Sequence, residues 1–185
     1  MKYGTWTVSS YRTADAQAMT QAGFSPITAA VLCSRGCTDL DTAKAFLAAN
    51  EPLTDPFALL DMDAAVRRVR AAIDRRELIC VFGDYDVDGI TATCLLTDFL
   101  RRQGASVVSY IPARLEEGYG LNELALRSLH EQGVNLIITV DCGITANEEA
   151  QLCRALGMEL VITDHHECKS ELPAAIAVVD PHRPD

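Results

Sequence analysis

Long apolar runs are missing from this 185-residue sequence, although 49% of its residues are hydrophobic. No stretch approaches the roughly 20 consecutive apolar residues that a membrane-spanning helix needs. The first ten residues also lack the basic segment followed by an apolar one that marks a secretory signal. We therefore expect a cytoplasmic protein without membrane contact, and its length allows one or two small domains.

Basic residues are scarce as well, because 16 Lys and Arg stand against 26 Asp and Glu, for a formal net charge of -10. This balance argues against a broad surface for phosphate groups, but it allows a nuclease whose basic groove lies elsewhere. The seven cysteines are odd in number and scattered among apolar neighbours, which indicates reduced core residues. Cys33 and Cys37 lie one helical turn apart, without the second Cys or His pair that a zinc site needs.

The order of elements changes near residue 60. Residues 1–60 predict a small helical segment, whose helices begin at capping residues and end at glycine or asparagine, over 13–23, 25–36 and 39–50. From residue 61 helices (61–76, 90–103, 121–132, 145–156) alternate with strands expected over 77–82, 106–111, 135–140, 159–163 and 176–179. Such alternation indicates an α/β fold with a parallel sheet and helices on both faces, so we expect a sheet domain over 61–185.

Polar residues follow the ends of three of these strands. Asp84, Asp86 and Asp88 follow the first strand, Asp141 follows the third, and Asp164, His165 and His166 follow the fourth. In open parallel sheets ligands bind outside the carboxyl ends of the strands, so residues that are far apart in sequence can meet there. Clustered carboxylates repel one another unless a cation lies among them, and oxygen ligands suit Mg, Mn and Ca. We therefore expect a metal site at this edge of the sheet.

Each of these residues has a plainer interpretation when it is taken alone. The stretch 83–89 could be an acidic surface turn, Asp141 could cap the following helix, and the two histidines could form a solvated turn. Their joint placement after three strands favours the metal site.

The three stretches resemble the first three motifs of the DHH phosphoesterase family. They are Gly83-Asp84-Tyr85-Asp86-Val87-Asp88-Gly89, Val140-Asp141-Cys142-Gly143 and Thr163-Asp164-His165-His166. Within the family the likeness is greatest to the single-strand-specific 5′-to-3′ DNA exonucleases of DNA repair and recombination. It extends to Trp6, Arg35-Gly36 with the helix after it, Ile111-Pro112, and the segments 116–121 and 180–185. The resemblance therefore implies metal-dependent hydrolysis of phosphodiester bonds.

Carried over to this sequence, the resemblance implies a pair of Mn2+ or Mg2+ ions with these ligands: Asp84, Asp86, Asp88, Asp141 and His165. His166 would face the phosphate or assist the leaving group, and Asp164 would orient the neighbouring loop. Two such ions would activate a water and stabilise the leaving oxygen. Single-stranded DNA is the implied substrate, with single-strand-binding proteins or helicases as partners.

Two positions depart from the common pattern of the family. Other branches carry a histidine where this chain has Phe82, and many members carry asparagine where it has Asp180. The first departure bears on Asp84, which lies two residues after Phe82 and is the ligand that the other branches support least.

The loop after the second strand holds Arg114 and Tyr119 on the same side as the expected site. Arg114 could contact a phosphate, with Tyr119 as a stacking surface for a base. Alternatively, Arg114 could pair with Glu116 or Glu117 while the tyrosine packs against the fold.

The resemblance also implies parts that this sequence does not contain. Members of the family continue past the segment that matches 180–185 to a fourth motif with another metal-binding aspartate, and then to DNA-binding domains. We therefore expect the sheet domain to be truncated at its C-terminus. A second hypothesis is a phosphoesterase for short oligonucleotides, cyclic dinucleotides or pyrophosphate. A third is a non-catalytic docking module, against which the intact set of mutually repelling acids argues.

Overall fold

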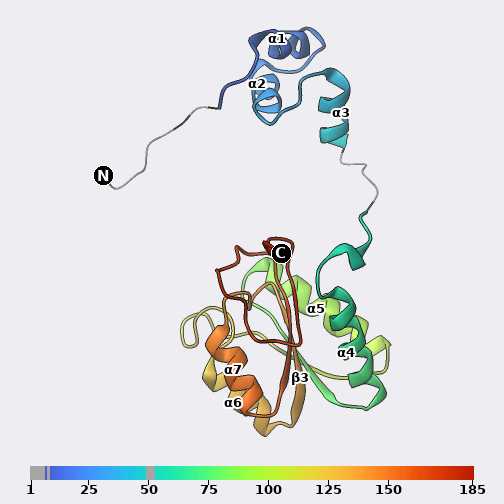
Figure 1. Ribbon diagram of the computed structural model, residues 1–185, viewed down its shortest axis with the longest axis vertical. Coiled ribbons are helices and arrows are strands. Elements are labelled where there is room, and N and C mark those ends of the chain that lie inside the picture. The colour runs from blue at the N-terminus through green and yellow to red at the C-terminus, as the bar shows by residue number, and fades with distance from the viewer. Residues whose placement is uncertain (1–6, 8, 49–52) are drawn as a thin grey trace, which may run out of the picture. The chain divides into compact units, whose positions relative to one another are not determined.

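The computed structural model describes residues 7, 9–48 and 53–185. The chain divides into two compact units, Met1–Thr54 and Asp55–Asp185, and each is described by itself (Figure 1). Trp6, which is part of the family resemblance, and Asn50, the expected end of a helix, lie outside the described residues. Within the described ranges, no helix combines the length and the apolar character that crossing a membrane requires.

The first unit packs short helices around a small apolar core. Its helices are α1 (Thr13–Gln21), α2 (Pro26–Ser34) and α3 (Leu40–Ala48). Ser25 caps α2, because its hydroxyl oxygen accepts a hydrogen bond from the amide of Thr28 at 3.1 Å. Cys33 and Cys37 lie buried in this core as free thiols, in agreement with the expectation of reduced core cysteines.

The second unit is built on a five-stranded parallel sheet with the strand order β2-β1-β3-β4-β5. Its strands are β1 (Leu78–Phe82), β2 (Ser106–Tyr110), β3 (Val134–Val140), β4 (Glu159–Thr163) and β5 (Ala177–Val179). The central strands form at continuous apolar runs, because both of their faces are buried and need hydrophobic side chains. The expected α/β fold with a parallel sheet is confirmed.

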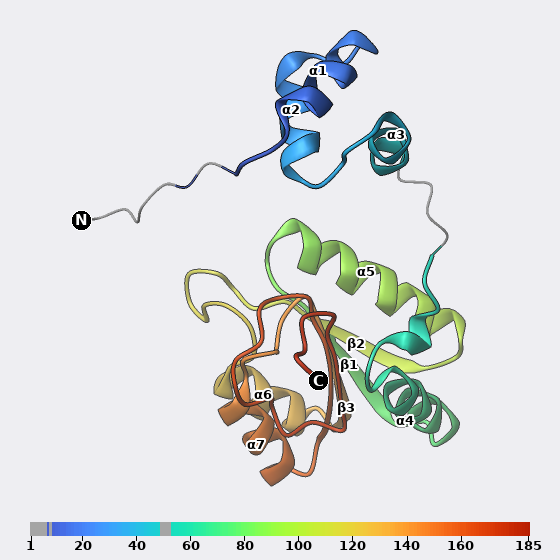
Figure 2. The same ribbon diagram turned by 45° about the horizontal axis from the view of Figure 1, so that its top comes forward.

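Helices cover both faces of this sheet. They are α4 (Met62–Asp74), α5 (Val87–Arg102), α6 (Glu123–Glu131) and α7 (Asn147–Ala155), and a short 3-10 turn, η1 (Pro56–Ala58), precedes α4. Figure 2 shows α4 and α5 on one side of the strands and α6 and α7 on the other. Alternate side chains of β1 serve the two layers: Ile79 and Val81 pack in the core under α4 and α5, whereas Cys80 and Phe82 pack under α6 and α7.

The strand order creates a switch point between β1 and β3. The chain leaves β1 through α5 to form β2 on one side, and then returns through α6 to place β3 on the other side of β1. The loops after β1 and β3 start side by side at the carboxyl edge of the sheet and then turn towards opposite faces, which opens a crevice between them.

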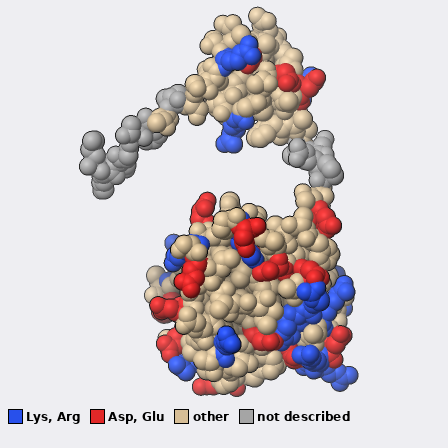
Figure 3. All heavy atoms as spheres, viewed as in Figure 1, with Lys and Arg blue, Asp and Glu red and all other residues tan. Residues whose placement is uncertain are grey.

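Basic side chains of the second unit gather over α4. This helix carries Arg67, Arg68 and Arg70, with Arg75 and Arg76 directly after it, and Figure 3 shows the blue area they contribute to. Because α4 ends where β1 begins, the arginines of its last turns lie towards the amino ends of the strands. The main basic area on this face is therefore separate from the crevice at the carboxyl ends.

Candidate metal centre

The loop after β1 packs tightly against the first turn of α5. A Cβ atom on Gly89 would lie 2.5 Å from the carbonyl oxygen and 2.6 Å from the amide nitrogen of Asp84, and one on Gly83 would collide with the hydroxyl of Thr93. Neither glycine has room for a side chain, so both are required by close approach of backbone to backbone. The loop 83–89 is consequently a compact turn, and its carboxylates are held at fixed places.

The aspartates of this loop have different surroundings. Asp84 is buried, and its Oδ1 has no hydrogen-bond partner within the described part of the chain. Asp86 caps α5, because its Oδ1 accepts the amides of Asp88 and Gly89, each at 3.0 Å. Helix α5 therefore begins at Val87 and not near Ile90 as expected. Asp88 stands exposed in the first helical turn.

Asp141 follows β3 in an unusual backbone conformation. Its φ of 62° is left-handed, a region that non-glycine residues adopt at a cost and that aspartate tolerates better than most. The peptide is held from two sides: its amide donates to the carbonyl of Thr163 at 3.2 Å, and its carbonyl accepts the hydroxyl of Tyr119 at 3.2 Å. Ala146, not Asp141, precedes the first residue of α7, so Asp141 is not its cap.

Asp164 organises the loop after β4. Its Oδ1 accepts the amides of His165 at 2.7 Å and of His166 at 3.2 Å, and its Oδ2 accepts the amide of Ile144 at 2.9 Å. The same Oδ1 lies 2.7 Å from Nδ1 of His166. With its carboxylate engaged in this way, Asp164 fixes the course of the loop and the ring of His166.

The loops after β3 and β4 meet in a cluster of ligand atoms. Nε2 of His165 lies 2.7 Å from Oδ1 of Asp141, and ligand atoms of Asp141, His165 and His166 all lie within 4.8 Å of one another. A pocket of about 330 Å3 adjoins the cluster, and Asp88 lines it together with Asp141, Asp164 and His165. The structure thus brings residues from the loops after β1, β3 and β4 to one place.

The carboxyl groups of this cluster perturb each other. Burial raises the pKa of Asp141, and the nearby charge of Asp86 raises it further, although the bond with His165 acts in the opposite direction. The amide of Gly89 is the main cause that lowers the pKa of Asp86. For His166, the hydrogen bond with Asp164 is the main cause of a raised pKa. Crowded acids of this kind raise the free energy of the folded state unless a cation or a proton lies between them.

The residues fit a divalent cation on three observations. Asp84 presents a buried carboxylate oxygen without a partner, which is costly unless something positive satisfies it. Asp86 and Asp141 are close enough to repel each other. The donor set combines carboxylate oxygens with imidazole nitrogen, which suits Mn2+ and accepts Mg2+ through the carboxylates.

Arg114 stacks on Tyr85, for which the sequence analysis predicts no role. Its guanidinium carbon lies 5.0 Å from the centre of the Tyr85 ring. No ion pair between Arg114 and Glu116 or Glu117 occurs in the described ranges; instead, Glu117 accepts hydrogen bonds from the hydroxyl of Tyr110 and from the amide of Ala113. In the sequence, Tyr85 stands between two aspartates without a pattern of its own. Only its alternation with them could have predicted a role for it.

Asp180 is a further buried acid of the second unit. It follows β5 at the same edge of the sheet, is 3% exposed, and accepts the amide of His182 at 2.7 Å through Oδ1. Its Oδ2 is buried without a partner among the residues described. The rule that singled out the other acids, a polar residue directly after a strand, would have found it.

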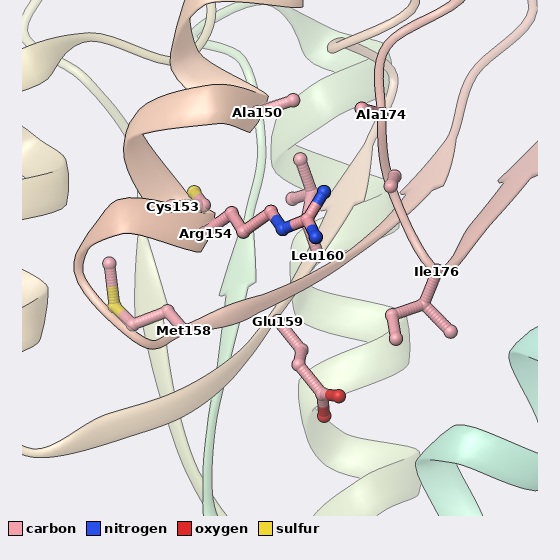
Figure 4. A pocket seen from close by; sticks show the side chains of 9 residues that line it. Ala150, Cys153, Arg154, Met158, Glu159, Leu160, Ala174 and Ile176 are labelled. Carbon is pink, nitrogen blue, oxygen red and sulfur yellow. The ribbon is translucent and has the colours of Figure 1, made fainter.

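A second hollow lies away from this cluster. It also measures about 330 Å3 and lies between α7 and the chain that leads into β5, with Arg154 directed into it (Figure 4). Glu159 on its rim is engaged by Arg68 of α4. This hollow contains no group of metal ligands within the described residues, so the chemistry points to the first cluster.

Comparison with known proteins supplies the context of this centre. Residues 78–185 match the model described as the DHH family, N-terminal domain. The chain is 43% identical over 165 residues to the single-stranded-DNA-specific exonuclease RecJ of Bacillus subtilis, which covers 89% of the chain and 21% of that protein. It is 38% identical over 128 residues to RecJ of Escherichia coli, with 69% and 22% covered.

A solved structure is similar as well. The crystal structure of an exonuclease RecJ bound to manganese matches with a TM-score of 0.66 and 37% identity, over 72% of this chain and 34% of that one. The chain spans about a fifth of the length of the curated relatives that it matches.

Proposed function

The chain belongs to the DHH family, and from this premise we propose that it is the metal-binding catalytic part of an exonuclease that degrades single-stranded DNA from the 5′ end. The observation that carries the proposal is the meeting of Asp141, His165 and His166 at one edge of the sheet, next to the carboxylates of the loop after β1. The similar proteins named as single-stranded-DNA-specific exonucleases support the choice of substrate.

In this proposal two Mn2+ or Mg2+ ions lie between the loops after β1, β3 and β4. Asp86, Asp88, Asp141 and His165 would hold them, and the unpartnered oxygen of Asp84 supports a place for this residue among the ligands. The manganese-bound structure of a similar exonuclease favours Mn2+. When bound, such ions would make a water more acidic and offset the negative charge that develops on the phosphate.

The chain's own side chains would orient the substrate and move a proton. The bond between His166 Nδ1 and Asp164 leaves Nε2 of His166 free to face the phosphate. A raised pKa keeps more of this imidazole protonated, so Nε2–H can donate a proton to the leaving oxygen. Arg114, which is not engaged by the acids of its own loop, would contact a phosphate of the strand.

We also propose that the centre is part of a longer enzyme. Since the chain spans about a fifth of its curated relatives, the remaining length of such a protein can supply a further acidic ligand and the surfaces that grip DNA. Residues 61–185 would belong to the DHH domain, and 1–60 would be a helical segment before it. A cytoplasmic location and contacts with single-strand-binding proteins or helicases complete the proposal.

Calorimetric titration with Mn2+ tests the centre directly. Wild-type chain should bind Mn2+, Asp141→Ala should not, and Asp98→Ala should bind as wild type does, because Asp98 pairs with Arg102 on the surface of α5. Binding by Asp141→Ala equal to wild type would contradict the proposed centre.

A competition assay tests the substrate. Single-stranded DNA should compete better than cyclic dinucleotides or pyrophosphate for the Mn2+-loaded chain. The reverse order would point to a phosphoesterase for small substrates.

A further inference from the structure

Tyr85 lies at the junction of the metal centre and the loop that carries Arg114. It stands between Asp84 and Asp86 in the chain and is half-buried. Arg114 covers one face of its ring at 5.0 Å, and the ring of Tyr119 meets it edge-on, with centroids 6.5 Å apart and planes at 84°. The proposed function gives Tyr85 no role, although its neighbours on both sides have one.

Arg114 depends on this ring for a fixed position. The arginine is exposed, and within the described residues it has no ion pair. A free arginine side chain samples many rotamers, and ordering it for a ligand is unfavourable. The carboxylate of Glu117, a nearby candidate partner, is already used by Tyr110, Ala113 and Asn122. A guanidinium over an aromatic face is attracted by the ring quadrupole, so the Tyr85 ring restricts where Arg114 can be.

The loop 113–120 is tied to the centre at its other end. The hydroxyl of Tyr119 donates to the carbonyl of Asp141 at 3.2 Å and lies 3.4 Å from Nδ1 of His166. The ring of Tyr119 also meets the His166 ring edge-on, with centroids 6.0 Å apart. Through the Tyr85–Tyr119 contact, the ring that carries Arg114 is therefore joined to the loops of the centre.

We propose that Tyr85 is a positioning residue, whose ring holds Arg114 ready to receive a phosphate of the substrate strand. The inference rests on the proposed function, because it takes the phosphate to be that of a nucleic acid bound at the centre. Tyr85 then acts on substrate affinity through Arg114, and not on the affinity for the metal.

A double-mutant cycle on the 185-residue chain separates this role from a structural one. Binding of a short fluorescent oligothymidylate is followed by anisotropy in Ca2+, which accepts the same oxygen ligands. Tyr85→Leu should weaken binding about two- to five-fold, while Tyr85→Phe retains it because phenylalanine keeps the aromatic face. In the background of Arg114→Ala, Tyr85→Leu should have no further effect, since the partner of the ring is gone.

Two measurements keep the outcomes apart. The side-chain protons of Arg114 should lose their ring-current shift in Tyr85→Leu and keep it in Tyr85→Phe, which reports the position without any substrate. Calorimetry should give wild-type Mn2+ affinity for Tyr85→Leu. Additive losses in the cycle, or an unchanged Arg114 spectrum in Tyr85→Leu, would overturn the role of Tyr85. Failure of wild-type chain to bind both Mn2+ and oligothymidylate would instead count against the proposed function.

Discussion

Nε2 of His165 lies 2.7 Å from Oδ1 of Asp141, which joins the loop after β4 to the loop after β3 at the carboxyl edge of the sheet. The side chain of His165 is 59% exposed, whereas that of Asp141 is 7% exposed. The pair therefore faces the solvent through its imidazole and the protein interior through its carboxylate. The pair thus presents one imidazole nitrogen and one carboxylate oxygen side by side, and Asp88 of the β1 loop lines the same pocket.

The tight loop after β1 predicts a large effect of adding one methyl group. Gly89→Ala should lower the free energy of unfolding by about 1–3 kcal/mol, because its Cβ would collide with the backbone of Asp84. Urea denaturation measures the difference. Cys94→Ala, on the exposed surface of the same helix, is the matched control and should stay within about 0.5 kcal/mol of wild type. Equal stability of Gly89→Ala and wild type would contradict the packing described for this loop.

Asp164 should raise the pKa of the His166 ring. The pKa of His166 is raised, mainly by its hydrogen bond with Asp164 and further by the charges of Asp141 and Asp86. Asp164→Asn should therefore lower it towards the ordinary value of about 6.5. A histidine with a raised pKa in the folded state stabilises the fold below its unfolded pKa, and this contribution disappears as the pH rises through the folded value. NMR titration of the His166 ring in metal-free wild-type chain and in Asp164→Asn measures the shift.

The strands, and the residues at the carboxyl edge of the sheet, were predictable from local sequence. β4 has the bounds expected from its apolar run, and β1 and β3 begin within one residue of the expected positions. Buried parallel strands give continuous apolar runs, because the side chains on both faces of the strand pack against a hydrophobic layer. The acids and histidines of the centre were predictable for a related reason, since a polar residue directly after such a strand lies at the carboxyl edge of the sheet.

The start of α5 and the contact of Arg114 were not predictable in this way. The sequence predicts a helix from residue 90, but the side chain of Asp86 satisfies two free amides and so starts the helix at Val87. The contact of Arg114 with Tyr85 joins two loops that are far apart in sequence. No local pattern encodes such a contact, because it depends on how β1 and β2 pair.

The hydroxyl of Tyr119 should contribute to metal affinity through the backbone of Asp141. Tyr119→Phe removes the bond to the Asp141 carbonyl but keeps the ring, so we expect Mn2+ binding to weaken about two- to ten-fold, as for the loss of one ordinary hydrogen bond. Calorimetry measures the change. Tyr11→Phe, an exposed tyrosine of the other unit, is the control and should bind as wild type does. If both variants bind Mn2+ alike, the hydroxyl does not hold Asp141 in place.

Ionised Asp141 should destabilise the metal-free fold. Burial and the charge of Asp86 raise its pKa, so its ionisation opposes folding at every pH above its ordinary value of about 3.9. Asp141→Asn keeps the size of the side chain, tolerates the left-handed backbone and removes the charge. In metal-free buffer at neutral pH the variant should be more stable than wild type, by on the order of 1 kcal/mol.

The difference in stability between wild type and Asp141→Asn should change with pH and with Mn2+. Lowering the pH below the ordinary aspartate value should remove the advantage of Asp141→Asn, because wild-type Asp141 is then protonated in both the folded and the unfolded state. Adding Mn2+ at neutral pH should stabilise wild type and leave the variant nearly unchanged, since a ligand that binds only the folded state shifts the equilibrium by its affinity. Urea denaturation with EDTA and with Mn2+ measures both effects. A variant that is less stable than wild type in EDTA at neutral pH would show that Asp141 serves the fold itself, through its bond with His165, and that the metal is not the reason for its burial.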